Sequence, residues 1–113
     1  MSVFVEEAIT DGQGNIALTV PQGHTWRLLS FVVSISAGET VGLFYDAPGS
    51  ATFYAVRGIT GTEGDISFGI GAPLIQSAAI NNTPLPNILL PSGSIIQLQV
   101  GSVGQTVFFL IED

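Results

Sequence analysis

The chain has 113 residues with no cysteine and no lysine, and 10% of its residues are charged, against about 25% in typical soluble domains. Nine acidic residues and two arginines, Arg27 and Arg57, give a net charge of −7. This composition excludes disulfide scaffolds and disfavours binding to nucleic acids and to anionic membranes. No apolar run approaches the ~20 residues of a spanning helix, and the length predicts a single domain over 1–113.

Short segments rich in Val, Ile, Phe and Thr, separated by glycine and proline, predict strands along the whole chain. The predicted strands cover 3–9, 16–20, 25–37, 40–46, 51–59, 66–70, 74–80, 94–100 and 106–112. The segment 74–80 also fits a short helical turn. Eight or nine short strands at intervals of about ten residues predict an all-β fold, an antiparallel β-sandwich of the jelly-roll-like kind.

One turn sequence occurs twice. "VPQGH" at 20–24 and "LPSGS" at 90–94 both place a proline two residues before a glycine, and an apolar-rich strand follows each. Proline ends ladder pairing and glycine suits a tight turn, so both predict a corner that leads into the core. The first corner aims Trp26 inward. Two equivalent places in a jelly roll explain the repetition, and chance similarity of turn chemistry is the alternative.

Residues suited to catalysis or metal binding lack the partners that such chemistry needs. His24 is the one histidine of the chain and is best explained as a turn residue. Glu6 and Glu7 are neighbours on a strand, so their side chains point to opposite faces. "DGQGN" at 11–15 lacks the later ligands of a calcium loop, and Ser92 lies in no nucleophile motif. We therefore predict no enzyme, no catalytic residue, no cofactor and no metal.

Two predicted strands, 25–37 and 106–112, are apolar on both faces. A sandwich strand needs only one buried face, so a second apolar face has two explanations. A β-bulge near Ser30 would reset the alternation in the longer strand, or a partner covers the outer face. The sequence favours a covering partner, because large apolar patches seldom stay exposed. The candidate interface residues are Leu29, Phe31, Val33, Ile35, Phe108 and Leu110.

Aromatic residues near one loop suggest a different function. Tyr45 and Tyr54 flank the "DAPGS" loop and are the candidate residues of a glycan- or receptor-binding site. Trp26 is better assigned to the core, because it opens a long apolar strand.

Both ends of the chain carry a recognisable pattern. "VPQGHTWRLLSFVVSISAGETVG", and downstream "ILLPSGSIIQLQVGSVGQTVFFLIED", resemble small β-sandwich virion structural proteins of tailed bacteriophages. The residues that carry the resemblance are Pro21, Gly23, Trp26, Arg27, Leu28, Leu90, Pro91, Gly93 and Glu112.

The resemblance implies a jelly-roll-like capsid decoration or cement protein, a trimer among its possible assemblies. Its partners would be the major capsid protein and copies of itself, and its location the capsid surface of the virion, with host cytoplasm during assembly. A neck or tail component fits the resemblance equally. The glycan- or receptor-binding module is the alternative from another class of function.

Overall fold

A computed structural model describes residues 2–36, 38–49, 52–60, 64–69, 74–75, 85–101 and 103–113. Within these residues all regular structure is strand: β1 (Val3–Ile9), β2 (Asn15–Thr19), β3 (Arg27–Ile35), β4 (Thr40–Asp46), β5 (Phe53–Thr60), β6 (Gly64–Gly69), β7 (Leu74–Ile75), β8 (Ile95–Val100) and β9 (Thr106–Glu112). The predicted all-β architecture is confirmed, and the described residues contain no helix. Of the predicted segment 74–80, residues 76–80 lie outside the described residues.

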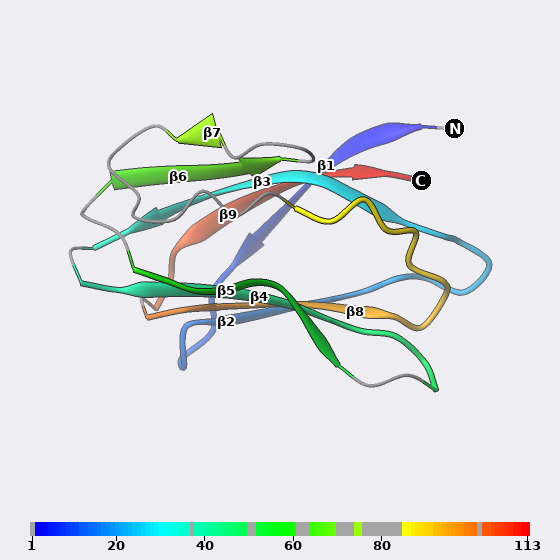
Figure 1. Cartoon of the computed structure of the whole chain (residues 1–113), viewed down its shortest axis with the longest axis horizontal. Coiled ribbons are helices and arrows are strands. Elements are labelled where there is room, and N and C mark those ends of the chain that lie inside the picture. The colour runs from blue at the N-terminus through cyan, green and yellow to red at the C-terminus, as the bar shows by residue number, and fades with distance from the viewer. Residues whose placement is uncertain are drawn as a thin grey trace.

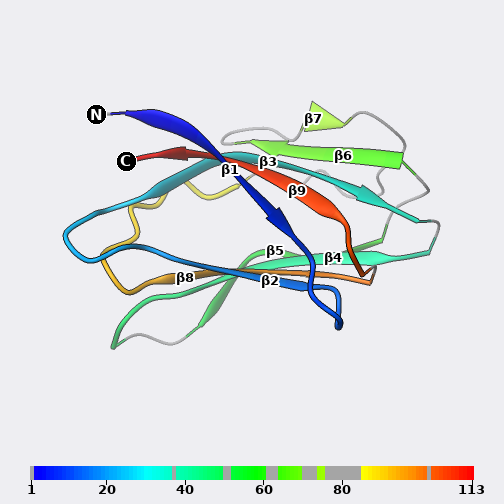
Figure 2. The same ribbon diagram turned by 180° about the vertical axis from the view of Figure 1, so that it is seen from behind.

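Two antiparallel sheets form two layers (Figures 1 and 2). Sheet A has the strand order β1-β9-β3-β6-β7, and sheet B has the order β2-β8-β4-β5. All pairings are antiparallel. The chain crosses from one layer to the other at most connections, whereas β4 and β5, and likewise β6 and β7, pair within one sheet. β1 and β2 are edge strands of different sheets. The result is a β-sandwich with its core between the layers.

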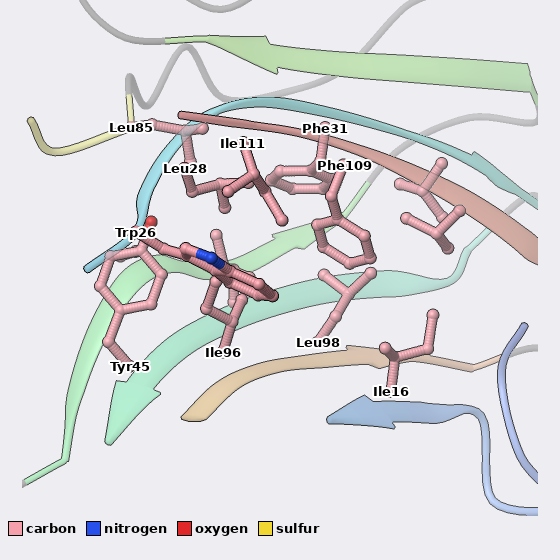
Figure 3. Close-up of a cluster of buried hydrophobic side chains, with 14 of the residues drawn as sticks. Ile16, Trp26, Leu28, Phe31, Tyr45, Leu85, Ile96, Leu98, Phe109 and Ile111 are labelled. Carbon is pink, nitrogen blue, oxygen red and sulfur yellow. The ribbon is translucent and has the colours of Figure 1, made fainter. Parts of the chain in front are cut away.

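Alternating side chains from both sheets fill the space between the layers (Figure 3). In β9, for example, Val107, Phe109 and Ile111 are each 0% exposed, as the period of two in a strand requires. Trp26 is buried, as predicted, and its ring packs against that of Phe4 in a T-shaped arrangement with a centroid distance of 5.5 Å. The burial of these apolar side chains is the main source of stability.

A β-bulge in β3 explains one of the two strands that read as apolar on both faces. The pairing of β3 with β9 shifts between Leu28 and Ser30. Leu28 and Phe31 are both buried although they are three residues apart, because the bulge resets the alternation between them. The bulge near Ser30 is therefore the correct explanation for this strand, and the proposed outer apolar face of β3 is largely part of the core.

The two proline–glycine turns lie side by side. In each turn the residue after the glycine donates its backbone N–H to the proline carbonyl, and Gly23 and Gly93 both have φ of 83°, as a type II turn requires. Ser92 Oγ accepts a hydrogen bond from Gly23 N at 3.0 Å and donates one to the His24 carbonyl at 2.9 Å. The repeated sequence thus builds two similar corners at one end of the sandwich.

The turn between β1 and β2 depends on a glycine at one position. Gly14 has φ of 77°, and a Cβ there would lie 2.0 Å from the carbonyl oxygen of Val100. The Gly14 carbonyl also accepts a hydrogen bond from Val100 N at 2.8 Å. Only glycine combines this positive φ with so close an approach to the neighbouring strand.

Candidate interaction surface

The outer face of sheet A carries exposed apolar side chains on adjacent strands. In β9, Phe108 is 43% exposed while its neighbour Phe109 is fully buried. In β1, the residues with outward side chains include Val3, Val5 and Ile9, and Val5 is 59% exposed. β1 pairs with β9 through all seven residues without a bulge, whereas the pairing of β3 with β9 contains one. The exposed apolar side chains of β9 therefore result from the regular geometry of the strand.

The register places these side chains in rows across three strands. Val5 pairs with Leu110, and Leu110 pairs with Ser30 on its other side. In the next row Phe108 lies between Glu7 of β1 and Val32 of β3. Side chains opposite each other in neighbouring strands touch, so the rows form a continuous surface, which we call the outer apolar face.

A shallow depression of about 320 Å³ lies in the outer apolar face. Its lining residues come from three neighbouring strands and are Val5, Ser30, Phe31, Val32, Phe108, Phe109 and Leu110. A second depression, of about 130 Å³, also borders Phe108 and Val32. Phe108 therefore stands as a ridge between hollows, a shape suited to contact with another protein surface.

Charges around the outer apolar face are mainly negative. The guanidinium Nη1 of Arg27 donates to Glu112 Oε1 at 2.9 Å, so this cation is engaged within the chain. Glu7 is exposed on this face, and its neighbour Glu6 is half-buried on the other face of β1. Since the chain has no lysine, the negative charge of these two carboxylates has no basic neighbour on β1 or on β9.

A second polar cluster ties the first corner to the end of β9. His24 Nδ1 lies 2.8 Å from Asp113 Oδ2, and His24 itself is exposed. The hydroxyl of the nearby Ser92 forms hydrogen bonds with the backbone of Gly23 and of His24. These hydrogen bonds connect the two corners with each other and with the end of the chain, so the role of the cluster is structural.

The "DGQGN" segment forms a tight turn. Asp11 Oδ1 accepts hydrogen bonds from the backbone N–H of Asn15 at 3.0 Å and of Gln13 at 2.8 Å. The hydrogen bond from Asn15, and next to it that from Gln13, lower the pKa of the Asp11 carboxyl. Among the described residues no group of three or more His, Cys, Asp or Glu side chains has the spacing of a metal site.

The predicted interface residues separate into four groups. Phe108 and Leu110 belong to the outer apolar face, and half-buried Leu29 lies in the bulge. Phe31 and Val33 are each 1% exposed and belong to the core, so their assignment to an exposed interface is wrong, and the β-bulge is the physical reason. The side chain of Ile35 lies outside the described residues.

Sequence reasoning missed the contribution of β1 to the outer apolar face. Val3, Val5 and Ile9 occupy alternate positions of "VFVEEAI". That alternation was a usable signal, because every second residue of a strand shares a face. The glutamates in the same segment masked it.

The predicted glycan platform does not form. Tyr45 is 1% exposed and packs in the core, where burial raises the pKa of its hydroxyl. A sugar-stacking ring must be accessible, so the assignment of Tyr45 to a glycan site is wrong. The side chain of Tyr54 lies outside the described residues.

No helix long and apolar enough to cross a membrane occurs in the described part of the chain.

Comparison with known proteins gives a fold relationship only. No protein-family profile matches the sequence, and no curated protein matches it. Among solved structures the chain is similar to Drosophila NLP-core, with a TM-score of 0.50, 11% identity and full coverage of both chains. That structure is described as giving insight into pentamer formation and histone binding. At this identity the likeness concerns the fold.

This finding overturns the function predicted above. The chain shares its fold with Drosophila NLP-core, whose structure is described as giving insight into histone binding. The prediction of a capsid decoration or cement protein, together with its neck or tail and glycan-binding alternatives, is therefore wrong. The major capsid protein as partner and the trimer are wrong for the same reason. The sequence resemblance to phage virion proteins stays a prediction, since it rested on turn and strand-entry residues that the fold itself requires.

Proposed function

We propose that this chain is a non-enzymatic subunit of a homo-oligomer that binds basic protein segments of the kind found in histones. The observation that carries the proposal is uncompensated negative charge beside an exposed apolar surface. Nine acidic residues stand against two arginines, and the side chain of Arg27 is engaged by Glu112.

The outer apolar face supports the oligomer. Phe108, Leu110 and Val5 lie in one continuous surface around a depression, and exposed patches of this kind in soluble proteins commonly mark contacts with other proteins. The occupant we propose is a second copy of the chain. The pentamer formation described for Drosophila NLP-core supports this choice.

The charge balance supports a basic partner. A net charge of −7 on a small domain produces a field that attracts cationic proteins and speeds their association, and copies gathered in an oligomer would add their fields. Histone binding described for the structural neighbour is consistent with this partner class.

We also propose that the sandwich follows a jelly-roll path of eight main strands, with β7 as an addition. The neighbour orders β1-β9-β3-β6 and β2-β8-β4-β5 support it. The chain crosses between the sheets at most connections, with β4 and β5 as a pair within one sheet, as in two joined Greek keys.

Two measurements test the proposed function. Size-exclusion chromatography with light scattering should give the mass of an oligomer. Fluorescence anisotropy with labelled core histones should show binding that weakens steeply with salt. Hen lysozyme, a basic protein without extended basic tails, is the control and should bind much more weakly. The proposal would be contradicted if the chain is a monomer and does not bind histones at low ionic strength.

A further inference from the structure

Strand β1 (Val3–Ile9) is an open edge of sheet A. It pairs with β9 on one side, and the described part of the chain supplies no strand on the other. Natural edge strands are usually protected by charged side chains, proline, a bulge or short length. β1 pairs over seven residues with no bulge and contains no proline, and its charged residues are the carboxylates Glu6 and Glu7.

The hydrogen-bond pattern identifies which main-chain groups face the open edge. Ser2 and Asp113 exchange two backbone hydrogen bonds, with N···O distances of 3.2 and 2.8 Å. In an antiparallel pair such residues alternate with residues whose N–H and C=O point away from the partner. The outward-pointing groups therefore belong to Val3, Val5, Glu7 and Ile9.

The same four residues have exposed side chains on the outer face of sheet A. A strand added at this edge would thus gain main-chain hydrogen bonds and, next to them, contacts with two valines and an isoleucine. Glu7 interrupts this apolar row. Half-buried Glu6 points to the other face of the sheet, so an added strand would meet two adjacent carboxylates, one on each face.

Charge determines which strand fits the edge. A second copy of β1, paired antiparallel over its full length, would place Glu6 opposite Glu6, and like charges directly opposite are destabilising. A segment with two adjacent basic residues would instead place one cation opposite Glu6 and one opposite Glu7. β-Branched residues on either side would pair with Val5 and Ile9.

We propose that the β1 edge accepts an extended basic segment as an added strand, with adjacent Lys and Arg flanked by β-branched residues. This inference rests on the proposed function and specifies its site. Affinity comes from the main-chain hydrogen bonds of Val3, Val5, Glu7 and Ile9, and selectivity from the two carboxylates.

The probe is a fluorescent seven-residue peptide, Val-Thr-Lys-Arg-Val-Thr-Val, which places Lys opposite Glu7 and Arg opposite Glu6 in the antiparallel register. Two derivatives share its charge. One is N-methylated at the Lys and at the following Val, opposite Glu7 and Val5 respectively, and should bind at least about tenfold more weakly because the blocked N–H groups face the edge. The other is N-methylated at the Arg and at the first Thr, whose N–H groups point away, and should bind like the parent.

Variants of the full chain test the same edge from the protein side. Val5→Pro removes an outward N–H and no hydrogen bond to β9, so it should keep the fold, as edge positions of this kind tolerate proline, but it should weaken peptide binding at least about tenfold. Val5→Thr, which keeps the N–H, is the matched control. Glu6→Gln with Glu7→Gln should remove the preference for Lys-Arg over a Gln-Gln peptide. Circular dichroism monitors folding of each variant.

The outcomes separate the site from the proposed function. Equal binding of the two N-methylated peptides, or normal binding by a folded Val5→Pro variant, overturns the edge site. If that variant still binds core histones as the wild type does, the proposed function stands and its site lies elsewhere. If the wild type binds neither histones nor the peptide, the proposed function itself fails. If Val5→Pro loses its oligomer and leaves peptide binding intact, while Val5→Thr keeps the oligomer, the edge would be assigned to a second copy.

Discussion

The outward residues of β8 in sheet B and of β9 in sheet A differ, although their inward residues are alike. In β8 and in β9 every second residue is buried in the same core. Outward, β8 presents Ile95, Gln97 and Gln99, whereas β9 presents Thr106, Phe108, Leu110 and Glu112. Hydrogen-bonding amides suit contact with water, but an exposed phenylalanine between two hollows does not. The inward residues therefore explain the fold, and the exposed Phe108 of sheet A is left for contact outside the subunit core.

Substitutions of two adjacent phenylalanines in β9 should differ most in their effect on the free energy of unfolding. Phe109→Ala should lower the free energy of unfolding by about 3–5 kcal/mol, because it leaves a cavity in the core. Phe108→Ala should cost less than about 1 kcal/mol in the isolated subunit, because its side chain is already partly in water. Urea unfolding followed by tryptophan fluorescence measures both. Equal losses would mean that Phe108 is covered within the subunit and would remove the contrast between the two faces.

The second prediction compares the two outer faces directly. Phe108→Asp should weaken self-association at least about tenfold, because a charge replaces the ridge of the outer apolar face. Gln97→Asp adds the same charge to sheet B and should leave the oligomer intact. Light scattering over a dilution series measures both variants. Dissociation caused by Gln97→Asp alone would place the subunit contact on sheet B.

The third prediction concerns the ion pair where β3 and β9 meet at one end of sheet A. Arg27→Met should destabilise the subunit by roughly 1–2 kcal/mol, since it leaves the partly buried Glu112 carboxylate without its charged donor. Glu112→Gln is the companion change, and the double variant should lose less than the sum of the two single losses. Additive losses in chemical denaturation would show that the pair is not energetically coupled.

Sequence reasoning succeeded where local chemistry decides the structure. The alternation in 16–20, together with short segments rich in Val, Ile, Phe and Thr between glycine and proline, predicted an antiparallel all-β fold correctly. The burial of Trp26 and the turns at Gly23 and Gly93 follow from the same local rules. These features depend on strand period and on backbone geometry, which neighbouring residues specify.

The functional surface was harder to predict because it depends on pairing between distant segments. A single inserted residue near Leu28 moved Phe31 and Val33 from a proposed interface into the core, and nothing in the local pattern decides between a bulge and a second exposed face. The apolar row of β1 becomes a surface only when Val5 lies beside Leu110. The function read from a resemblance failed because the shared residues, such as Pro21, form corners that unrelated proteins of similar fold also need.

The smallest predicted effect lies at the turn that links β1 of sheet A to β2 of sheet B. The folded state lowers the pKa of Asp11 through hydrogen bonds to the carboxylate from the backbone of Asn15 and Gln13. The contribution of this carboxylate to stability is therefore complete above its unfolded pKa of about 4 and is lost as the pH falls through the lower folded value.

Asp11→Asn should make the midpoint of thermal unfolding slightly lower at pH 7 and less sensitive to acid below about pH 4. Gly12→Ala changes the same turn without changing its charge, and the space around Gly12 is open, so this control should keep the acid sensitivity of the wild type. Thermal unfolding between pH 2 and pH 7 distinguishes them. If Asp11→Asn keeps the wild-type acid sensitivity, the turn holds through its backbone bonds alone, and the link between the two sheets does not depend on the carboxylate.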